Sequence, residues 1–165
     1  MNGRLKWVKD LVDHLKSDPN LNEIAAKYIQ VKAEYRGLDE DIQHSPQIWL
    51  VPLEAKPEKK INGRYSTCPQ RISHKFLLAV VVRNVYDTRN NVDWSHSGSQ
   101  VFLGAYPEAD ALELKVRKSV LEFNRLLENS PQDYDSFSLV EMPQPDSALN
   151  GNLVLGCFYE TSYTF

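Results

Sequence analysis

FLLAVVV, the stretch from Phe76 to Val82, has no polar face. A strand of a one-layer antiparallel sheet alternates apolar and polar side chains, because one of its faces meets solvent. The stretch therefore predicts a strand that is covered on both faces. A second apolar run, IWLVPL at Ile48–Leu53, precedes it. We expect two strands, over about Gln47–Glu54 and Ile72–Tyr86, with the first bulged or at a sheet edge because Pro52 cannot donate a ladder hydrogen bond.

Length and composition indicate one globular domain that spans residues 1–165. The chain is 42% hydrophobic and 25% charged, with a net charge of −3, which lacks the basic character of a nucleic-acid-binding protein. No apolar run approaches the roughly 20 residues that cross a bilayer. Cys68 and Cys157 are far apart in sequence, and we expect two free thiols in a reducing compartment. These features predict neither a nucleic-acid nor a membrane partner.

Three segments have the periodicity of amphipathic helices. The first covers about Arg4–Lys16, and the second Asn22–Tyr35, although part of the second, AKYIQVKAEY, is also compatible with a strand. The third and strongest covers Glu108–Leu127, with Pro107 just before its start. Its apolar residues form a stripe that Leu114 and Leu121 widen. The stripe consists of Ala109, Leu112, Val116, Val120, Phe123 and Leu127.

The C-terminal part has the pattern of a β-hairpin. Asn150-Gly151 is a strong turn signal, because both residues tolerate a positive φ. One strand is expected at Phe137–Pro143 and the other at Leu153–Thr164. The predicted fold class is α+β: a four-stranded antiparallel sheet of two hairpins, with helices packed on one face and N-terminal helices over about residues 4–35. The other face, which carries part of FLLAVVV, would then be exposed as an interface.

The sequence offers little for catalysis or for a cofactor. No histidines or cysteines have metal-ligand spacing, His14 is expected on a solvated helix surface, and no glycine-rich phosphate-binding motif follows a strand. The segment DWSHSGS (Asp93–Ser99) could place His96 beside Ser95 or Ser97 as a hydrolase site. Triad members normally converge from distant positions, and no nucleophile elbow is present. We therefore predict a protein that is not an enzyme and holds no metal or cofactor.

The loop at Ala55–Gln70 is polar and expected to project from the sheet. It allows two interpretations: a solvated hairpin tip, or an electrostatic contact with an acidic partner surface. Its basic residues are Lys56, Lys59, Lys60 and Arg64.

Several segments, taken in order, resemble a known family, the tail terminator proteins of long-tailed bacteriophages. After an opening amphipathic helix, they read IWLVPLEAKP, CPQRISHKFLLAVVVRN, ADALELKVRKSVLEFNRLL and NGNLVLGCFYETSYTF. The resemblance covers most of Pro46–Phe165 and rests on order and spacing. The sequence differs from the family pattern in two places, and both bear on which subfamily it resembles. ENSPQDYD stands where the family often has a Gly-Trp-x-Pro turn. The stretch Asn22–Gly37 is longer than expected for the family.

The resemblance implies a ring, usually a hexamer of identical chains, on the head-proximal end of the tail tube. Such a ring stops tube polymerisation and meets the tail tube protein, the head-tail connector protein and, in contractile tails, the sheath protein. It implies no reaction and no cofactor, and a place in the virion after assembly in the host cytoplasm. Alternatives are another neck component, such as a head completion or connector protein, or a small hydrolase using His96. The expected contact residues are Lys56, Lys59, Lys60 and Arg64, with Arg83 and Arg89 as weaker candidates.

Overall fold

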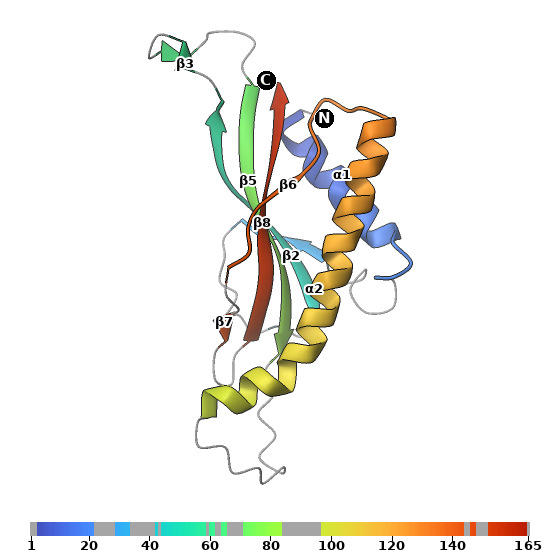
Figure 1. Ribbon diagram of the computed structural model, residues 1–165, viewed down its shortest axis with the longest axis vertical. Coiled ribbons are helices and arrows are strands. Elements are labelled where there is room, and N and C mark those ends of the chain that lie inside the picture. Colours follow the sequence, from blue (N-terminus) through green and yellow to red (C-terminus); the bar gives the residue numbers. More distant parts are fainter. Residues whose placement is uncertain are drawn as a thin grey trace.

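The computed structural model describes residues 3–21, 29–33, 42, 44–58, 60–61, 64–65, 71–83, 97–143, 146–147 and 152–164 (Figure 1). In these ranges, no helix is long and apolar enough to cross a membrane. The elements are α1 (Gly3–Ser17), β1 (Ile29–Val31), β2 (Gln47–Pro57), β3 (Lys60–Ile61), β4 (Arg64–Tyr65), β5 (Arg71–Arg83), α2 (Ser97–Asn129), β6 (Ser138–Glu141), β7 (Asp146–Ser147) and β8 (Asn152–Thr164).

The fold is α+β, with a mixed sheet in the strand order β1-β2-β5-β8-β6; the short β7 also pairs with β8. The prediction of a four-stranded antiparallel sheet is wrong, because β1 adds a strand parallel to β2. Ile29–Val31 was expected within a helix, with a strand left open for AKYIQVKAEY, and the structure forms the strand. Ile29 is buried there, and the Lys32 amide donates to the Leu50 carbonyl at 2.9 Å. Tertiary pairing with β2 thus overrides the helical periodicity of this segment.

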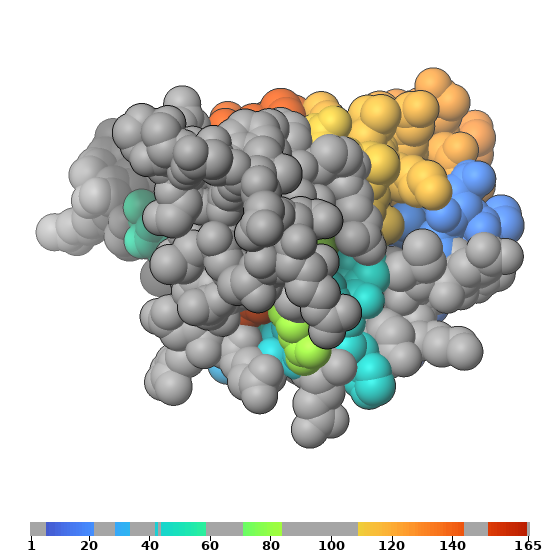
Figure 2. Space-filling model, turned by 90° about the horizontal axis from the view of Figure 1, so that it is seen from below, coloured from blue at the N-terminus to red at the C-terminus, as the bar shows by residue number. Residues whose placement is uncertain are grey.

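Both helices lie on the same side of the sheet, as predicted. Figure 1 shows α1 and α2 on one side of the strands, and Figure 2 shows their atoms together beside those of β2. An aromatic cluster fills the space between the layers. The ring of Trp7, from α1, lies 4.7 Å from that of Phe76 on β5, which meets Phe137 edge-on at 5.5 Å. Burial of each such side chain contributes roughly 1.5–3 kcal/mol.

The opposite face of the sheet is apolar and buried along part of its length. Trp49 on β2 is fully buried, and its Nε1 donates to Gln47 Oε1 at 2.7 Å. The strand register places Ala79 and Gly156 in the same row as this indole. The cluster on this face consists of Ile42, Trp49, Val51, Leu77, Ala79, Val81 and Val154, with Phe158 packed against it.

FLLAVVV is therefore covered on both faces, which confirms the prediction from its composition. Phe76, Leu78 and the alternate residues after them face the helices, and Leu77 and its alternates face the second cluster. The expectation of an exposed apolar sheet face is wrong. All seven side chains from Phe76 to Val82 are buried within the single chain.

Two prolines have different effects on their elements. The register of β2 against β5 shifts between Pro52 and Ala55, which confirms the predicted bulge. By contrast, α2 begins at Ser97 and runs through Pro107, where the sequence predicted that the helix would start only at Glu108. Figure 1 shows the first part of α2 turned away from the axis of the rest. A bend of this kind is typical of a helix that accommodates a proline.

The close approach of β8 to β5 yields a stability prediction at Gly156. A Cβ added there would lie 2.8 Å from the Leu78 carbonyl oxygen and 2.9 Å from Ala79 Cα. Because both neighbours are backbone atoms, Gly156→Ala should lower the free energy of unfolding by about 1–3 kcal/mol, measured by urea denaturation. Thr164→Ala, at the exposed end of the same strand, is the control and should change it by less than about 0.5 kcal/mol. Equal stability of the two variants would contradict the prediction.

Candidate interaction surface

The sheet ends at β6 on one side, and this strand is exposed. All four of its residues are exposed, and no lysine or proline interrupts the sequence Ser-Leu-Val-Glu. Leu139, Val140 and the following Met142 are each about half exposed. An outer strand presents unpaired backbone groups, and soluble proteins normally protect such edges with charge, proline or a covering segment. This edge has a register shift between Leu139 and Glu141 and one exposed charge, Glu141, and it also presents apolar side chains.

Helix α2 continues the apolar surface beside β6. Leu114 and Leu121 lie one above the other on its outer side, and both are exposed. Arg117, between them, has its guanidinium 3.8 Å from Met142 Sδ. We call Leu114, Arg117, Leu121, Leu139, Val140 and Met142 the edge surface. The sequence placed the two leucines in the buried stripe of the helix, and the structure corrects this, because the stripe that packs on the sheet is narrower.

The position of α2 against β6 is fixed by hydrogen bonds. Asn124 Nδ2 donates to the Phe137 carbonyl at 2.9 Å, and the Phe137 amide donates to Asn124 Oδ1 at 2.7 Å. One side chain thus satisfies both backbone groups of the residue before β6. The two parts of the edge surface are therefore held together before any partner binds.

A buried polar group lies behind the edge surface. Glu113 is buried, and its carboxylate pairs with Arg117 at 2.8 Å and accepts a hydrogen bond from Cys157 Sγ at 3.0 Å. Burial, and then this hydrogen bond, raises the pKa of the Cys157 thiol to about 12. Cys157 is a free thiol, as predicted, and it is unreactive at neutral pH. Cys68 lies outside the described residues.

The predicted contact residues are divided between separate places. Lys60 and Arg64 belong to β3 and β4, which pair with each other and stand beyond the ends of β2 and β5 (Figure 1). Lys56 lies in β2, opposite Ser73, and pairs with Glu54 at 2.9 Å, so it belongs to the sheet and not to the loop. Arg83 is the exposed last residue of β5. Lys59 and Arg89 lie outside the described residues.

A groove of about 720 Å³ lies near this end of the sheet, lined by residues that include Lys56, Glu58 and Glu160. Many of its polar side chains form hydrogen bonds or ion pairs with one another. Arg71, beside the groove, pairs with Glu58 at 2.9 Å and with Asp135, and hydroxyls donate to Glu58 and Glu160. No histidine or cysteine is among the described lining residues.

The hydrolase alternative cannot be placed on the structure. His96 and Ser95 lie outside the described residues, and Ser97 is the first residue of α2. No protein-family model matches the sequence, and no curated protein matches it. The resemblance to tail terminators stays a prediction that rests on the order of the quoted segments.

The shifted thiol predicts a loss of stability in alkali. Below about pH 9 the Cys157 thiol is protonated in both the folded and the unfolded state. Between pH 9 and about pH 12 the folded state keeps the proton that the unfolded state releases, so the free energy of unfolding falls as the pH rises. At pH 10.5 this loss amounts to about 2 kcal/mol.

Urea denaturation at pH 8 and pH 10.5 tests this prediction. The wild type should lose about 2 kcal/mol more between the two pH values than Cys157→Ala does. Titrating groups that do not interact with Cys157 are common to both proteins and cancel in the comparison, whereas the raised pKa of Tyr159 depends first on burial and then on Cys157. If the free energy of unfolding falls by the same amount in both proteins, titration of the Cys157 thiol does not cause the pH dependence.

Proposed function

We propose that the chain is a structural protein that assembles into a ring at the head-proximal end of a phage tail tube, stops tube polymerisation and joins the tail to the head connector. The edge surface is the observation that carries this proposal. An apolar patch next to the outer edge of a sheet is typical of a surface that another chain covers. The resemblance of the ordered segments to tail terminators supplies the identity of the assembly.

The geometry of the sheet favours association through edges. Both faces of β5 are already buried within the chain, so a neighbouring copy has no apolar sheet face to cover among the described residues. The two outer strands of the described sheet differ, since β6 is antiparallel to its neighbour and β1 is parallel to its own. An interface between two different surfaces of one chain repeats around an axis and closes into a ring when the rotation allows.

The β3–β4 hairpin is suited to a separate contact. It carries Lys60 and Arg64 and extends away from the main sheet (Figure 1). A basic arm outside the subunit body can meet an acidic surface of the tube without disturbing the ring. One chain would then use the edge surface for its own copies and the arm for the tube.

Mass and microscopy together test the proposal. We expect light scattering to detect a ring, alone or after addition of tail tubes from the same source, and electron microscopy to find the protein at one end of each tube. A chain that stays monomeric and never meets a tube would overturn the proposal. Binding at the portal side of the head, away from the tube, would favour the other neck component.

Replacing Leu121 by glutamate should prevent assembly without unfolding the chain. Leu121 is 58% exposed, so Leu121→Glu should change the free energy of unfolding by less than about 0.5 kcal/mol. A charge buried in the interface should weaken association at least about tenfold. Sedimentation velocity across a concentration series measures this change.

Leu126 provides a matched control on the same helix. It is 54% exposed, and it lies about 140° around α2 from Leu121, away from β6. Leu126→Glu should assemble like the wild type. If both variants assemble equally well, the edge surface is not the interface.

Reversing the charge of the hairpin should separate the two contacts. The double variant Lys60→Glu, Arg64→Glu should form rings normally but cap tubes more weakly, because an acidic tube surface would repel it. Salt should reduce the capping by the wild type, since exposed charges are screened. Tube length distributions from electron microscopy measure capping.

Lys115→Glu, a charge reversal at an exposed site on α2, is the control for this experiment. It should cap tubes like the wild type. Because the control changes the net charge by half as much as the double variant, a loss of capping in the control that is half as large or larger would mean that net charge, and not the hairpin, determines the contact.

A further inference from the structure

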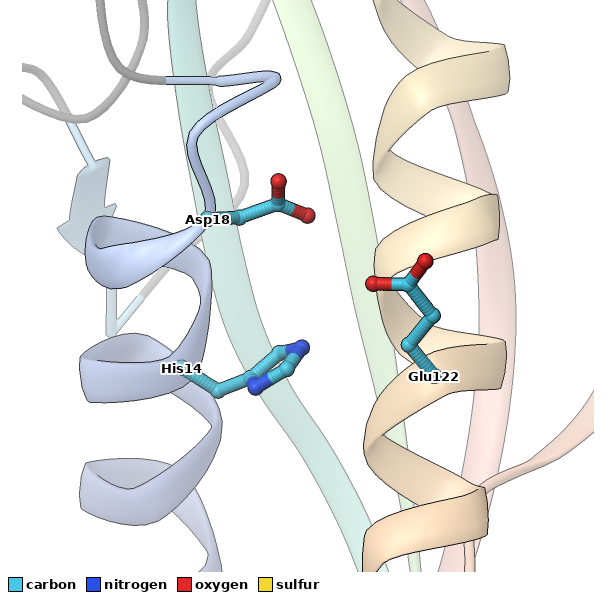
Figure 3. Close-up of side chains that lie close together, drawn as sticks. All are labelled: His14, Asp18 and Glu122. Atoms are coloured by element: carbon cyan, nitrogen blue, oxygen red, sulfur yellow. The ribbon is translucent and has the colours of Figure 1, made fainter.

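Three side chains converge where the end of α1 meets α2. His14 and Asp18 come from the last turn of α1 and the residue after it, and Glu122 comes from the C-terminal part of α2. Figure 3 shows the three pointing into the space between the two elements. A ring nitrogen of His14 and one oxygen of each carboxylate lie within 4.8 Å of one another. Sequence spacing could not reveal this set, because Glu122 is distant along the chain.

The buried member of the set is a carboxylate. Asp18 is only 6% exposed, and its Oδ1 accepts a hydrogen bond from the Asn20 amide at 2.8 Å. No lysine or arginine of the described residues forms an ion pair with it. A buried charge is normally paired or bound to a metal, because removing it from water without a partner is costly. A metal ion bound here would therefore give Asp18 a cationic partner.

The histidine is held in place on the other side of the space. His14 Nε2 lies 3.0 Å from the Ser119 carbonyl, and the ring stacks on Phe123 at 4.8 Å. The prediction of a solvated histidine is thus wrong. Because a carbonyl only accepts, Nε2 is the donor in this hydrogen bond, and Nδ1 takes no part in it. A backbone carbonyl orients metal-binding histidines in this way in many proteins.

The same helix contact contains an unsatisfied polar atom. The Ser119 hydroxyl is fully buried and has no hydrogen-bond partner among the described residues. Buried polar atoms nearly always have a partner, so an orphan of this kind indicates a water or an ion nearby. The C-terminal end of α1 adds the partial negative charge of its carbonyls, which also favours a cation.

We propose that His14, Asp18 and Glu122 bind a divalent transition-metal ion of the zinc class. One imidazole nitrogen and two carboxylate oxygens are ligands that Zn²⁺ accepts at about 2.0–2.2 Å. Among the described residues, the three side chains form no hydrogen bond or ion pair with one another that an ion would have to displace. Glu122 is exposed and can move to close the remaining distance. The ion would connect α1 to α2 and neutralise the buried Asp18.

Isothermal titration calorimetry of the full chain with ZnCl₂ tests the site. The wild type should bind one Zn²⁺ per chain, and saturating Zn²⁺ should raise Tm by about 5 °C. Glu122→Gln should weaken the affinity at least about tenfold. Because Glu122 is exposed, this variant should fold as the wild type does. Mg²⁺ should give no comparable shift, since it prefers all-oxygen sites.

Two further variants complete the test. Asp18→Asn keeps the acceptor for the Asn20 amide but removes the charge, and it should lose Zn²⁺ binding as Glu122→Gln does. Glu128→Gln, at an exposed site one to two turns further along α2, is the control and should bind like the wild type. Equal Zn²⁺ binding by all four proteins, or no binding by the wild type, would overturn the proposal. The measurement does not depend on ring formation, so it stands apart from the proposed function.

Discussion

The pairing of β5 with β8 is the contact on which the rest of the structure depends. All 13 residues of β5 are in register with β8, from Arg71 opposite Thr164 to Arg83 opposite Asn152. Both strands carry apolar side chains on both faces over much of this length. Two strands of this kind cannot lie at a solvated surface, so they need cover on both faces. The helices cover one face of the two strands. On the other face, the side chains of the cluster around Trp49 are buried against one another.

The sequence predicts the parts of the fold that local chemistry determines. FLLAVVV requires cover on both faces wherever it lies, and Pro52 disrupts a ladder in any sheet. The Ile29–Val31 strand could not be predicted in the same way, because only its pairing with β2 distinguishes it from a helix. The prediction that the helix starts after Pro107 was wrong for a related reason. A proline usually ends a helix, but packing of the later turns of α2 on the sheet can stabilise a helix that bends around it.

The candidate sites were harder to predict than the fold. Helical periodicity placed Leu114 and Leu121 near the buried stripe, but how wide that stripe is depends on what packs against it. The basic residues of the loop are close in sequence, yet the structure assigns Lys56 to the sheet, where Glu54 neutralises it. His14 and Glu122 meet only because α1 lies against α2. In each case the missing information was a tertiary contact.

Burial of both sheet faces constrains how this protein can associate. A partner that covered the face around Trp49 would first have to displace side chains that are already packed, and the free energy of that cluster would be lost. The edge surface carries no such cost, since its residues are exposed and its orientation is fixed through Asn124. The core and the proposed interface are therefore largely separate sets of residues in the described part of the chain, and Arg117, which pairs with the buried Glu113, belongs to both. Substitutions in FLLAVVV should act on folding, and substitutions of the exposed leucines of the edge surface should act on the proposed assembly.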